Sequence, residues 1–515
     1  MGTGDNNAHY RQYIPEGYRC LLGNFANGYD GTLVNGLQLL SQWEKFFNNP
    51  VGSSLGLLGA IQNIGSLGAI PLAPFWNDHF GRRLTVMLGG ALMIIGAAIQ
   101  TSSKNLGWFL GGRALVGFGG GFCNNANPLM VIELCYPSQR APIAGAYNSF
   151  TQTGAIIAAV AVFGCYYMTD SDWSWRLPLL IQVIPTGIQW SLVMFGPESP
   201  RWLIGKGKNE EALRILAKYH GDGNAEHPLV VYEFEEMKNA ISNENKSKAA
   251  WSHLFKTRGM RKRSFTMICL AVCGQWSGYS MVSYYLNQVL TTVGLTDRPV
   301  QLAINISISL LSFICGFTAG LNADRFGRRP IFLISIYGML ACFTGVTICT
   351  SLYVDSHSIV AGKITVLFVF LFTGFYSFGW ASVLLLYITE ISPFSIRSKA
   401  HSLFAITQAS MQTFNQYVNP IAFLAMGWKY YIVFDCFIVC IGCFVYFCVP
   451  ETKGHTLEET ALLFDGKDAV TQLQLHADMQ AGGVKPRTED HTVTNIRGSA
   501  TENKQIATVE HHETV

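Results

Sequence analysis

Asp78-His79-Phe80-Gly81-Arg82-Arg83 is the stretch that decides the fold, because the chain repeats it as Asp324-Arg325-Phe326-Gly327-Arg328-Arg329. Two further motifs repeat in the same order and at nearly the same offset. One such motif alone is weak evidence, but three paired motifs in register indicate two parallel halves, with a binding site expected between them. The other two pairs are Glu133 and Arg140 with Glu390 and Arg397, and Pro197-Glu198-Ser199 with Pro450-Glu451-Thr452.

The composition of the chain points to a membrane protein. Of its 515 residues, 49% are hydrophobic and only 13% are charged, whereas soluble domains carry about 25% charged residues. The net charge of +3 gives no reason to expect a nucleic-acid partner. The 13 cysteines lie in apolar segments and lack the neighbours that would complete a metal set. We therefore expect neither a metal nor a cofactor.

Twelve windows are apolar enough, at about 20 residues each, to cross the hydrocarbon core of a bilayer. They predict an all-α membrane protein whose twelve transmembrane helices form two six-helix bundles. The windows are 19–40, 54–77, 84–102, 107–134, 143–168, 177–197, 264–290, 300–323, 331–354, 363–389, 399–424 and 428–449.

The charges between these windows predict the topology. Arginine and lysine are concentrated in the even-numbered loops, which places both termini and the long middle loop in the cytoplasm. The middle loop carries helical signals, and the tail shows no apolar periodicity and reads as largely disordered. The expected parts are an N-terminus at 1–17, bundles at 18–197 and 263–449, a middle loop at 198–262 and a tail at 450–515.

Asp30 is the most unusual residue of the first window, where it stands within Asn27-Gly28-Tyr29-Asp30-Gly31. A carboxylate near the middle of a bilayer is costly unless it is paired, protonated or hydrated, so it is a candidate functional residue. Arg113, in the fourth window, is the charge that can pair with it. Two alternatives stay open: Asp30 marks a helix end or faces a water-filled vestibule, or the pair is a static structural ion pair.

Over residues 18–460 the chain resembles the sugar porter family of the major facilitator superfamily. Within that family it is similar to the branch of fungal lactose and cellodextrin permeases. The narrower resemblance rests on the stretch around Asp30, on Tyr147-Asn148 and on Asn419-Pro420-Ile421-Ala422. Family-wide motifs are Gly112-Arg113, Pro197-Glu198-Ser199-Pro200-Arg201-Trp202-Leu203 and Pro450-Glu451-Thr452-Lys453-Gly454.

This resemblance implies alternating access and a sugar-type substrate, with Asp30 and Arg113 as the proton-coupling pair. Carried over position by position, it gives the substrate-binding residues Asn35, Asn148, Gln275, Ser280, Ser312, Gln408 and Gln412. We expect Asn415 and Asn419 to continue the polar stripe of the eleventh helix, and Trp276, Tyr284 and Tyr285 to supply apolar faces. A gate cluster that closes the cytoplasmic side is expected from Asp78, Arg82, Glu133, Arg140, Glu198, Asp324, Arg328, Glu390 and Arg397.

Departures from the hexose-transporting members bear on the substrate. Gly274-Gln275 stands where those members carry two adjacent glutamines, and Leu385 occupies the position of a stacking tryptophan. A larger and emptier cavity follows, which suits a di- or oligosaccharide better than free glucose, with a hexose still possible.

The sequence therefore predicts a monomeric proton-coupled sugar symporter of the cell membrane, surrounded by lipid. We expect no enzyme, because no nucleophile and base stand together in the spans. One alternative is a facilitator or exporter of another small polar metabolite. The alternative from another class is a non-transporting nutrient receptor that signals through its tail.

Overall fold

The computed structural model describes residues 6–137, 140–168, 171–246, 251–392, 397–453 and 464, and of these it gives the backbone alone at 6–21, 140–149, 243–246, 321, 323–324 and 397–398. Every regular element in these residues is a helix. Residues up to Phe464 form one compact unit. The expected tail lies outside the described residues beyond 453, apart from Phe464.

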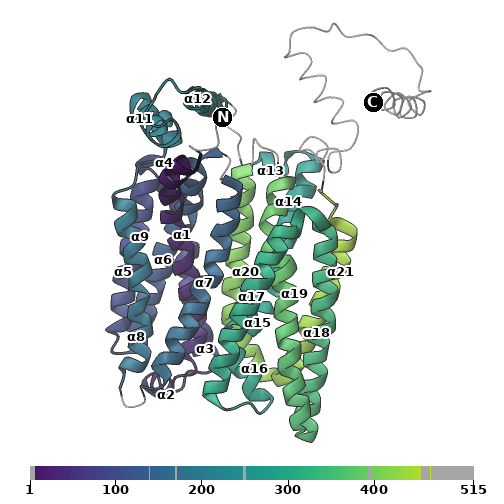
Figure 1. Ribbon diagram of the computed structural model, residues 1–515. Coiled ribbons are helices and arrows are strands. Elements are labelled where there is room, and N and C mark those ends of the chain that lie inside the picture. The colour runs from purple at the N-terminus through teal and green to yellow at the C-terminus, as the bar shows by residue number, and fades with distance from the viewer. Residues whose placement is uncertain are drawn as a thin grey trace, which may run out of the picture. The chain divides into compact units, whose positions relative to one another are not determined.

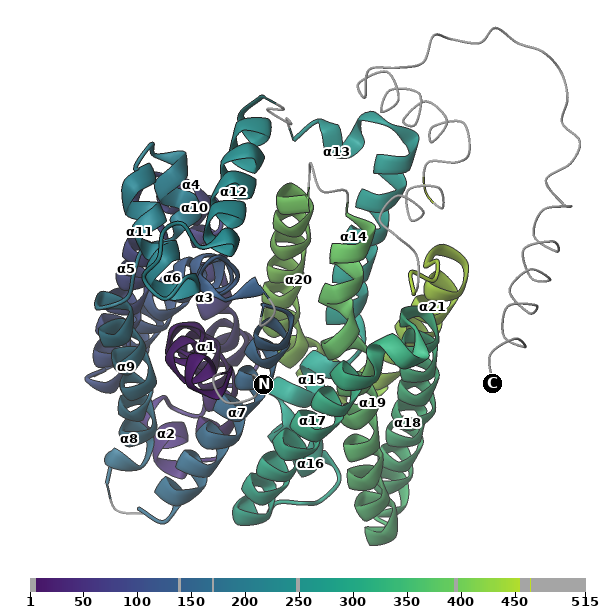
Figure 2. The same cartoon turned by 45° about the horizontal axis from the view of Figure 1, so that its top comes forward.

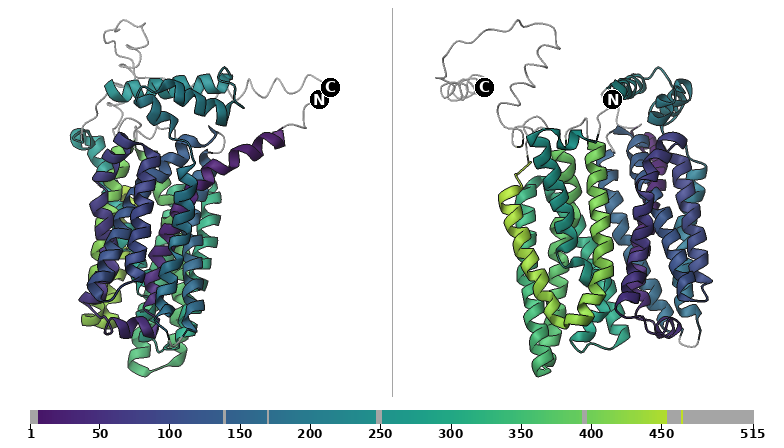
Figure 3. Two further views of the ribbon diagram at one scale, coloured as in Figure 1. Left: turned by 90° about the vertical axis from the view of Figure 1, so that its left-hand side faces the viewer. Right: turned by 180° about the vertical axis from the view of Figure 1, so that it is seen from behind.

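The helices of the first half lie together, in purple to blue in Figure 1. α1 begins at Asn6, well before the predicted window, since a helix once started gains a hydrogen bond with each added residue. Its beginning extends away from the other helices in Figure 3. The elements are α1 (Asn6–Leu37), α2 (Ser41–Phe46), α3 (Ser53–Ala69), α4 (Leu72–Phe80), α5 (Arg82–Thr101), α6 (Leu106–Leu134), α7 (Arg140–Tyr166), α8 (Trp173–Ile181) and α9 (Val183–Met194).

The middle loop is helical, as its sequence predicts. α10, α11 and α12 pack on one another through a small apolar cluster that includes Leu203, Ala212 and Phe234. Figure 2 shows these three helices across one end of the helices of the first half, which we name the α11 end, whereas α13 lies beside α14 of the second half. The elements are α10 (Pro200–Gly205), α11 (Asn209–His220), α12 (Pro228–Lys246) and α13 (His253–Lys256).

The second half contains the largest apolar core of the molecule, which includes Phe332, Phe343 and Trp380. The single helix predicted over 264–290 is broken instead, because Gly278 adopts a left-handed backbone with φ of 84°. The elements are α14 (Arg258–Trp276), α15 (Tyr279–Tyr284), α16 (Leu286–Thr292), α17 (Arg298–Phe326), α18 (Arg328–Ser356), α19 (Ile359–Ile391), α20 (Arg397–Met426), the 3-10 turn η3 (Gly427–Lys429) and α21 (Tyr430–Cys448).

Six helical stretches in the described residues are long and apolar enough to cross a membrane, or seven if the bent pair α3 and α4 is one span. The stretches that pass on their own are Arg82–Thr101, Trp173–Met194, Arg298–Gly320, Arg328–Ser356, Ile359–Ile391 and Lys399–Cys448. The fold is thus an all-helical bundle with several clear spans.

The sequence repeat corresponds to matching contacts in the two halves. Gly81 and Gly327 both have positive φ, at 97° and 91°, where they join one helix to the next. The backbone N–H of Arg82 donates to Glu198 Oε1 at 3.0 Å, and that of Arg328 donates to Glu451 Oε1 at 2.9 Å. Repeated residues therefore make repeated contacts, as parallel halves require.

Candidate functional site

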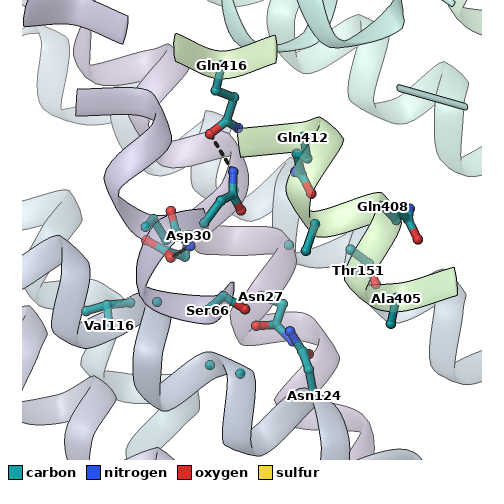
Figure 4. Close-up of a pocket in the computed structure, with 18 of the residues that line it drawn as sticks. Asn27, Asp30, Ser66, Val116, Asn124, Thr151, Ala405, Gln408, Gln412 and Gln416 are labelled. Atoms are coloured by element: carbon teal, nitrogen blue, oxygen red, sulfur yellow. Dashed lines mark hydrogen bonds between the residues drawn. The ribbon is translucent and has the colours of Figure 1, made fainter. Parts of the chain in front are cut away.

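A cavity of about 860 Å³ lies between the two halves, within the usual range of small-molecule sites. Its lining comes mainly from α1, α3, α6 and α7 on one side, with one residue each from α4 and α5, and from α15 and α20 on the other. Figure 4 shows the side chains of α20 facing those of the first half across this space. The lining continues to Pro71, Ser402 and Trp251, so the cavity extends toward the α11 end.

The opposite end, where α2 and α16 lie in Figure 1, is closed by contacts between the halves. Arg298 Nη2 donates to Glu44 Oε2 at 2.6 Å, and its Nη1 donates to the Leu39 carbonyl oxygen at 3.1 Å. Asn35 Nδ2 donates to Asn305 Oδ1 at 3.4 Å. We name this the α16 end.

A second set of contacts joins α3 to the second half at the level of the cavity. Asn63 Nδ2 donates to Gln416 Oε1 at 2.5 Å, the bond drawn at Gln416 in Figure 4. Within the second half, Tyr285 Oη donates to the carbonyl oxygen of the same glutamine at 2.6 Å and so helps to hold Gln416 in place. Glycine at 56 allows α3 to meet α20 closely, because a Cβ there would lie well under 3.0 Å from the Tyr417 carbonyl oxygen.

Asp30 and Arg113 are both buried and both line the cavity, as Figure 4 shows for Asp30. They do not meet directly: Gln62 of α3 lies between them. Gln62 Nε2 donates to Asp30 Oδ2, and Arg113 Nη2 donates to Gln62 Oε1 at 2.5 Å. The expected pair is therefore a chain of three side chains in this structure.

The polar stripe of α20 faces the cavity through Gln408, Gln412 and Gln416, at successive steps of four residues. Gln412 Nε2 also donates to Tyr284 Oη at 2.7 Å. Asn415 and Asn419, expected to continue this stripe, do not line the cavity in this structure: Asn415 donates to the Gln275 carbonyl oxygen and Asn419 accepts from Tyr430. Asn415 lies one residue before Gln416 and Asn419 lies three residues after it, so both are off the four-residue spacing that faces the cavity.

Several residues expected to bind substrate do not line the cavity. Gln275 and Ser280 bond to each other, with Ser280 Oγ 3.3 Å from Gln275 Oε1. Asn35 takes part in closing the α16 end, and Ser312 lies beside the Tyr279 hydroxyl. Trp276 stacks on Phe414 instead of facing the cavity, whereas Tyr284 and Tyr285 line it. The side chain of Asn148 lies outside the described residues.

The predicted gate residues form two equivalent clusters at the α11 end. Arg82 Nε donates to Glu133 Oε2 at 3.1 Å, and Ser199 Oγ donates to the same carboxylate. Arg328 Nη2 lies 2.7 Å from Glu390 Oε1. The Thr452 hydroxyl donates to the other oxygen of the same carboxylate. Each of these ion pairs lies within one half.

The other predicted gate residues are placed less uniformly. Asp78 lies 3.8 Å from Arg82 with a mostly exposed side chain. Burial raises the pKa of Glu198, although this carboxylate accepts backbone N–H groups from Ser199, Arg83 and Arg82. The side chains of Arg140, Asp324 and Arg397 lie outside the described residues.

The cavity also contains polar residues that the sequence did not single out. Gln62 and Asn63 are neutral amides in an apolar window, so their residue types alone give no signal. Asn27 donates to Asn124, and the two are labelled together in Figure 4. Gln416 could have been found, because it continues the spacing of Gln408 and Gln412.

The model of one protein family, described as "Sugar (and other) transporter", matches residues 19–464. The chain belongs to this sugar transporter family. The transporter is 27% identical over 468 residues to a high-affinity glucose transporter of Kluyveromyces lactis, covering 87% of this chain and 84% of that one. It is 28% identical over 463 residues to the hexose transporter HXT9 of Saccharomyces cerevisiae, with 85% and 81% covered.

Solved structures show the same fold. The proton:xylose symporter XylE bound to 6-bromo-6-deoxy-D-glucose matches with a TM-score of 0.72 at 23% identity, covering 88% of this chain and 99% of that one. An inward-open structure of XylE from E. coli matches with a TM-score of 0.71 at 22% identity, with 87% and 99% covered. The major facilitator fold and membership in a non-enzymatic transporter family are thereby shown, as the sequence predicts. The narrower lactose and cellodextrin permease branch is not.

Proposed function

We propose that this transporter carries a sugar across the cell membrane by alternating access, in symport with a proton. One observation carries the proposal: a polar cavity between the halves contains Asp30 and is closed at one end only. Alternating access requires a site between two halves that opens to one side at a time. The structure has the arrangement of one of these two states.

We infer twelve spans arranged as two six-helix bundles. Besides the clear spans and the bent pair α3 and α4, we count four further spans: α1, α6, α7 and the broken segment α14–α16. The stretch Lys399–Cys448 has 50 residues and includes a turn at η3, whereas one crossing needs about 20 residues. It is long enough for two crossings, by α20 and α21.

The proposed orientation follows from the distribution of arginine. Arg82 and Arg83 follow α4, whose Asp78 carbonyl oxygen accepts from Trp202 of α10 at the α11 end. Their repeats Arg328 and Arg329 follow α17, which begins with Arg298 at the α16 end and therefore ends at the α11 end. The positive-inside rule makes this end cytoplasmic and places both termini there. The cavity then opens inward, and the ion pair of Arg298 with Glu44 belongs to the extracellular side.

The gate clusters fit this inward-open arrangement. Their ion pairs, such as Arg82 with Glu133, lie within single halves, so the clusters can separate without any of these bonds breaking. In the outward-open state the two clusters would come together and close the cytoplasmic side. Paired buried charges of this kind act well as switch elements.

The proposed substrate is a neutral sugar. Sugar hydroxyls must exchange water for equivalent neutral donors and acceptors, and Gln408, Gln412, Gln416 and Asn63 supply amides around one cavity. The named relatives transport glucose or hexose. The cavity has room for more than one ring, so we include disaccharides with hexoses in the proposed class, as the departures at Gly274 and Leu385 suggest.

Uptake assays test this proposal. The transporter is expressed in a host that lacks its own sugar transporters and is given labelled glucose, xylose, lactose and cellobiose, with and without a protonophore. We expect accumulation of at least one sugar that the protonophore abolishes. Uptake that is indifferent to the protonophore refutes symport, and failure to take up any sugar refutes the substrate class.

A further inference from the structure

The amide of Gln62 can take only one orientation between Asp30 and Arg113. A guanidinium group has donors and no acceptor, so Gln62 must present Oε1 to Arg113. Its Nε2 then faces Asp30 and donates to Oδ2. Asp30 therefore has to be an acceptor at this oxygen. The charge state of the carboxyl group and the orientation of the amide are thus dependent on each other.

No other described side chain bonds to both charged groups. Asp30 Oδ1 and the Nε and Nη1 atoms of Arg113 are buried and form no hydrogen bond of normal geometry in the described part of the chain, and the Gln182 side chain lies next to the Asp30 carboxyl group but not between it and Arg113. The backbone of Gln62 is positioned by the close packing of α3 on α6, because a Cβ on Gly117 would overlap the Gln62 carbonyl group. Gln62 is thus held in place by its backbone as well as by its amide.

The neighbouring residue on α3 faces the other half of the transporter. Asn63 donates to Gln416 Oε1 of α20 at 2.5 Å, and Tyr285 donates to the carbonyl oxygen of the same glutamine. Gln416 lines the cavity with Gln412, as Figure 4 shows. Two consecutive residues of one helix therefore contact the proposed proton site and the proposed sugar site.

We propose that Gln62 and Asn63 are the positioning residues that couple the charge of Asp30 to the contact between the halves. The inference rests on the proposed symport and goes beyond it, because it assigns the coupling to neutral side chains of α3. Neither residue carries the proton. Their role is to transmit its presence from α1 to α20.

The physical step is a change in hydrogen bonding. A proton that enters from the aqueous cavity and binds Asp30 at Oδ2 turns this carboxylate oxygen into a hydroxyl, which accepts from the amide N–H of Gln62 less strongly and adds a donor of its own. A flip of the amide would satisfy Asp30 but would place N–H against the guanidinium group of Arg113, which cannot accept. Protonation at Oδ1 keeps the bond but removes the charge that strengthens it. Either way α3 is held less firmly to α1 and α6.

Gln62→Leu tests the proposal, with Gln100→Leu as the matched control. Gln100 is another buried glutamine of the first half, and it has no hydrogen-bond partner among the described residues. The assay uses a host in which the wild-type transporter accumulates the sugar. There we expect Gln62→Leu to keep the exchange of labelled for unlabelled sugar, with an uptake rate that no longer depends on pH. Proton-driven accumulation should fall about 10-fold or more. Gln100→Leu should behave as the wild type does.

A second variant covers the case in which Gln62→Leu does not fold. Gln62→Met has a side chain of similar length and no N–H to donate to Asp30, so it should uncouple in the same way. Asn63→Leu should also lower accumulation, and its effect on accumulation should not add to that of Gln62→Leu. Its KM for the sugar should rise as well, because Asn63 lines the cavity. Wild-type accumulation and a wild-type pH profile in either Gln62 variant overturn the inference. If the wild type itself shows no protonophore-sensitive accumulation, the proposed symport has failed instead.

Discussion

Gly56→Ala should shift the transporter toward the state that is open at the α16 end. The new Cβ would lie 3.1 Å from the Tyr417 carbonyl carbon and nearer still to its oxygen. Ordinary contacts between such atoms are about 3.5 Å or longer, so α3 and α20 must separate. The overlap exists only while the two helices touch. The state that is open at the α16 end therefore does not have this steric cost.

The size of the shift follows from the cost of overpacking. Inserting a methyl group into a close-packed contact costs about 1–3 kcal/mol. A free-energy difference of this size changes the ratio of the two states by about 5- to 150-fold, since each 1.4 kcal/mol is tenfold.

Labelling of Gln38→Cys measures this ratio. Gln38 lines the cavity near the closed end, where it donates to the Tyr284 carbonyl oxygen at 3.4 Å. A membrane-impermeant maleimide added outside should label the introduced cysteine faster when Gly56→Ala is also present, and protein without the added cysteine gives the background. Gly65→Ala is the control, because its overlap is with the Ala114 carbonyl group of the same half. Unchanged labelling in Gly56→Ala, together with normal transport, would show that the contact of α3 with α20 at residue 56 does not set the ratio of the two states.

Three further predictions concern single contacts. Glu44→Gln removes a partly exposed ion pair with Arg298, worth about 0.2–1 kcal/mol, and should raise the same labelling rate up to about fivefold; a lower rate would contradict it. Glu133→Gln leaves the mostly buried Arg82 with only the distant, exposed carboxylate of Asp78 and should lower the melting temperature of the purified protein clearly, since breaking a buried pair costs about 3–5 kcal/mol. Gln412→Leu removes an amide from the cavity and leaves the Tyr284 hydroxyl without this partner, so KM for the sugar should rise about 5- to 150-fold with little change in melting temperature.

The halves and their gate clusters could be predicted from the sequence because charge and repetition are strong signals. Glu133 and Glu390 occupy equivalent places in two copies of one motif, and their arginine partners follow the same glycine turn. Asp30 was found for a similar reason, since a carboxylate in an apolar window is costly without a function.

The finer geometry of the site could not be predicted. Gln62 is a neutral amide whose role comes from the close approach of α3 to α6 at Gly117, a distance that residue types do not determine. The choice of Gln416 over Asn415 depends on the rotation of α20 about its axis, because neighbouring residues differ by about 100°. The break at Gly278 was missed because an isolated glycine in an apolar run is common in membrane helices.

We propose that Asp30 carries the proton that drives sugar accumulation. Purified transporter in liposomes, given a gradient of about one pH unit, should accumulate the sugar up to about tenfold if one proton moves with each sugar, because a tenfold ratio equals about 1.4 kcal/mol. Asp30→Asn should still exchange labelled for unlabelled sugar at a measurable rate but should show no accumulation. Accumulation by Asp30→Asn at the wild-type level would contradict the account.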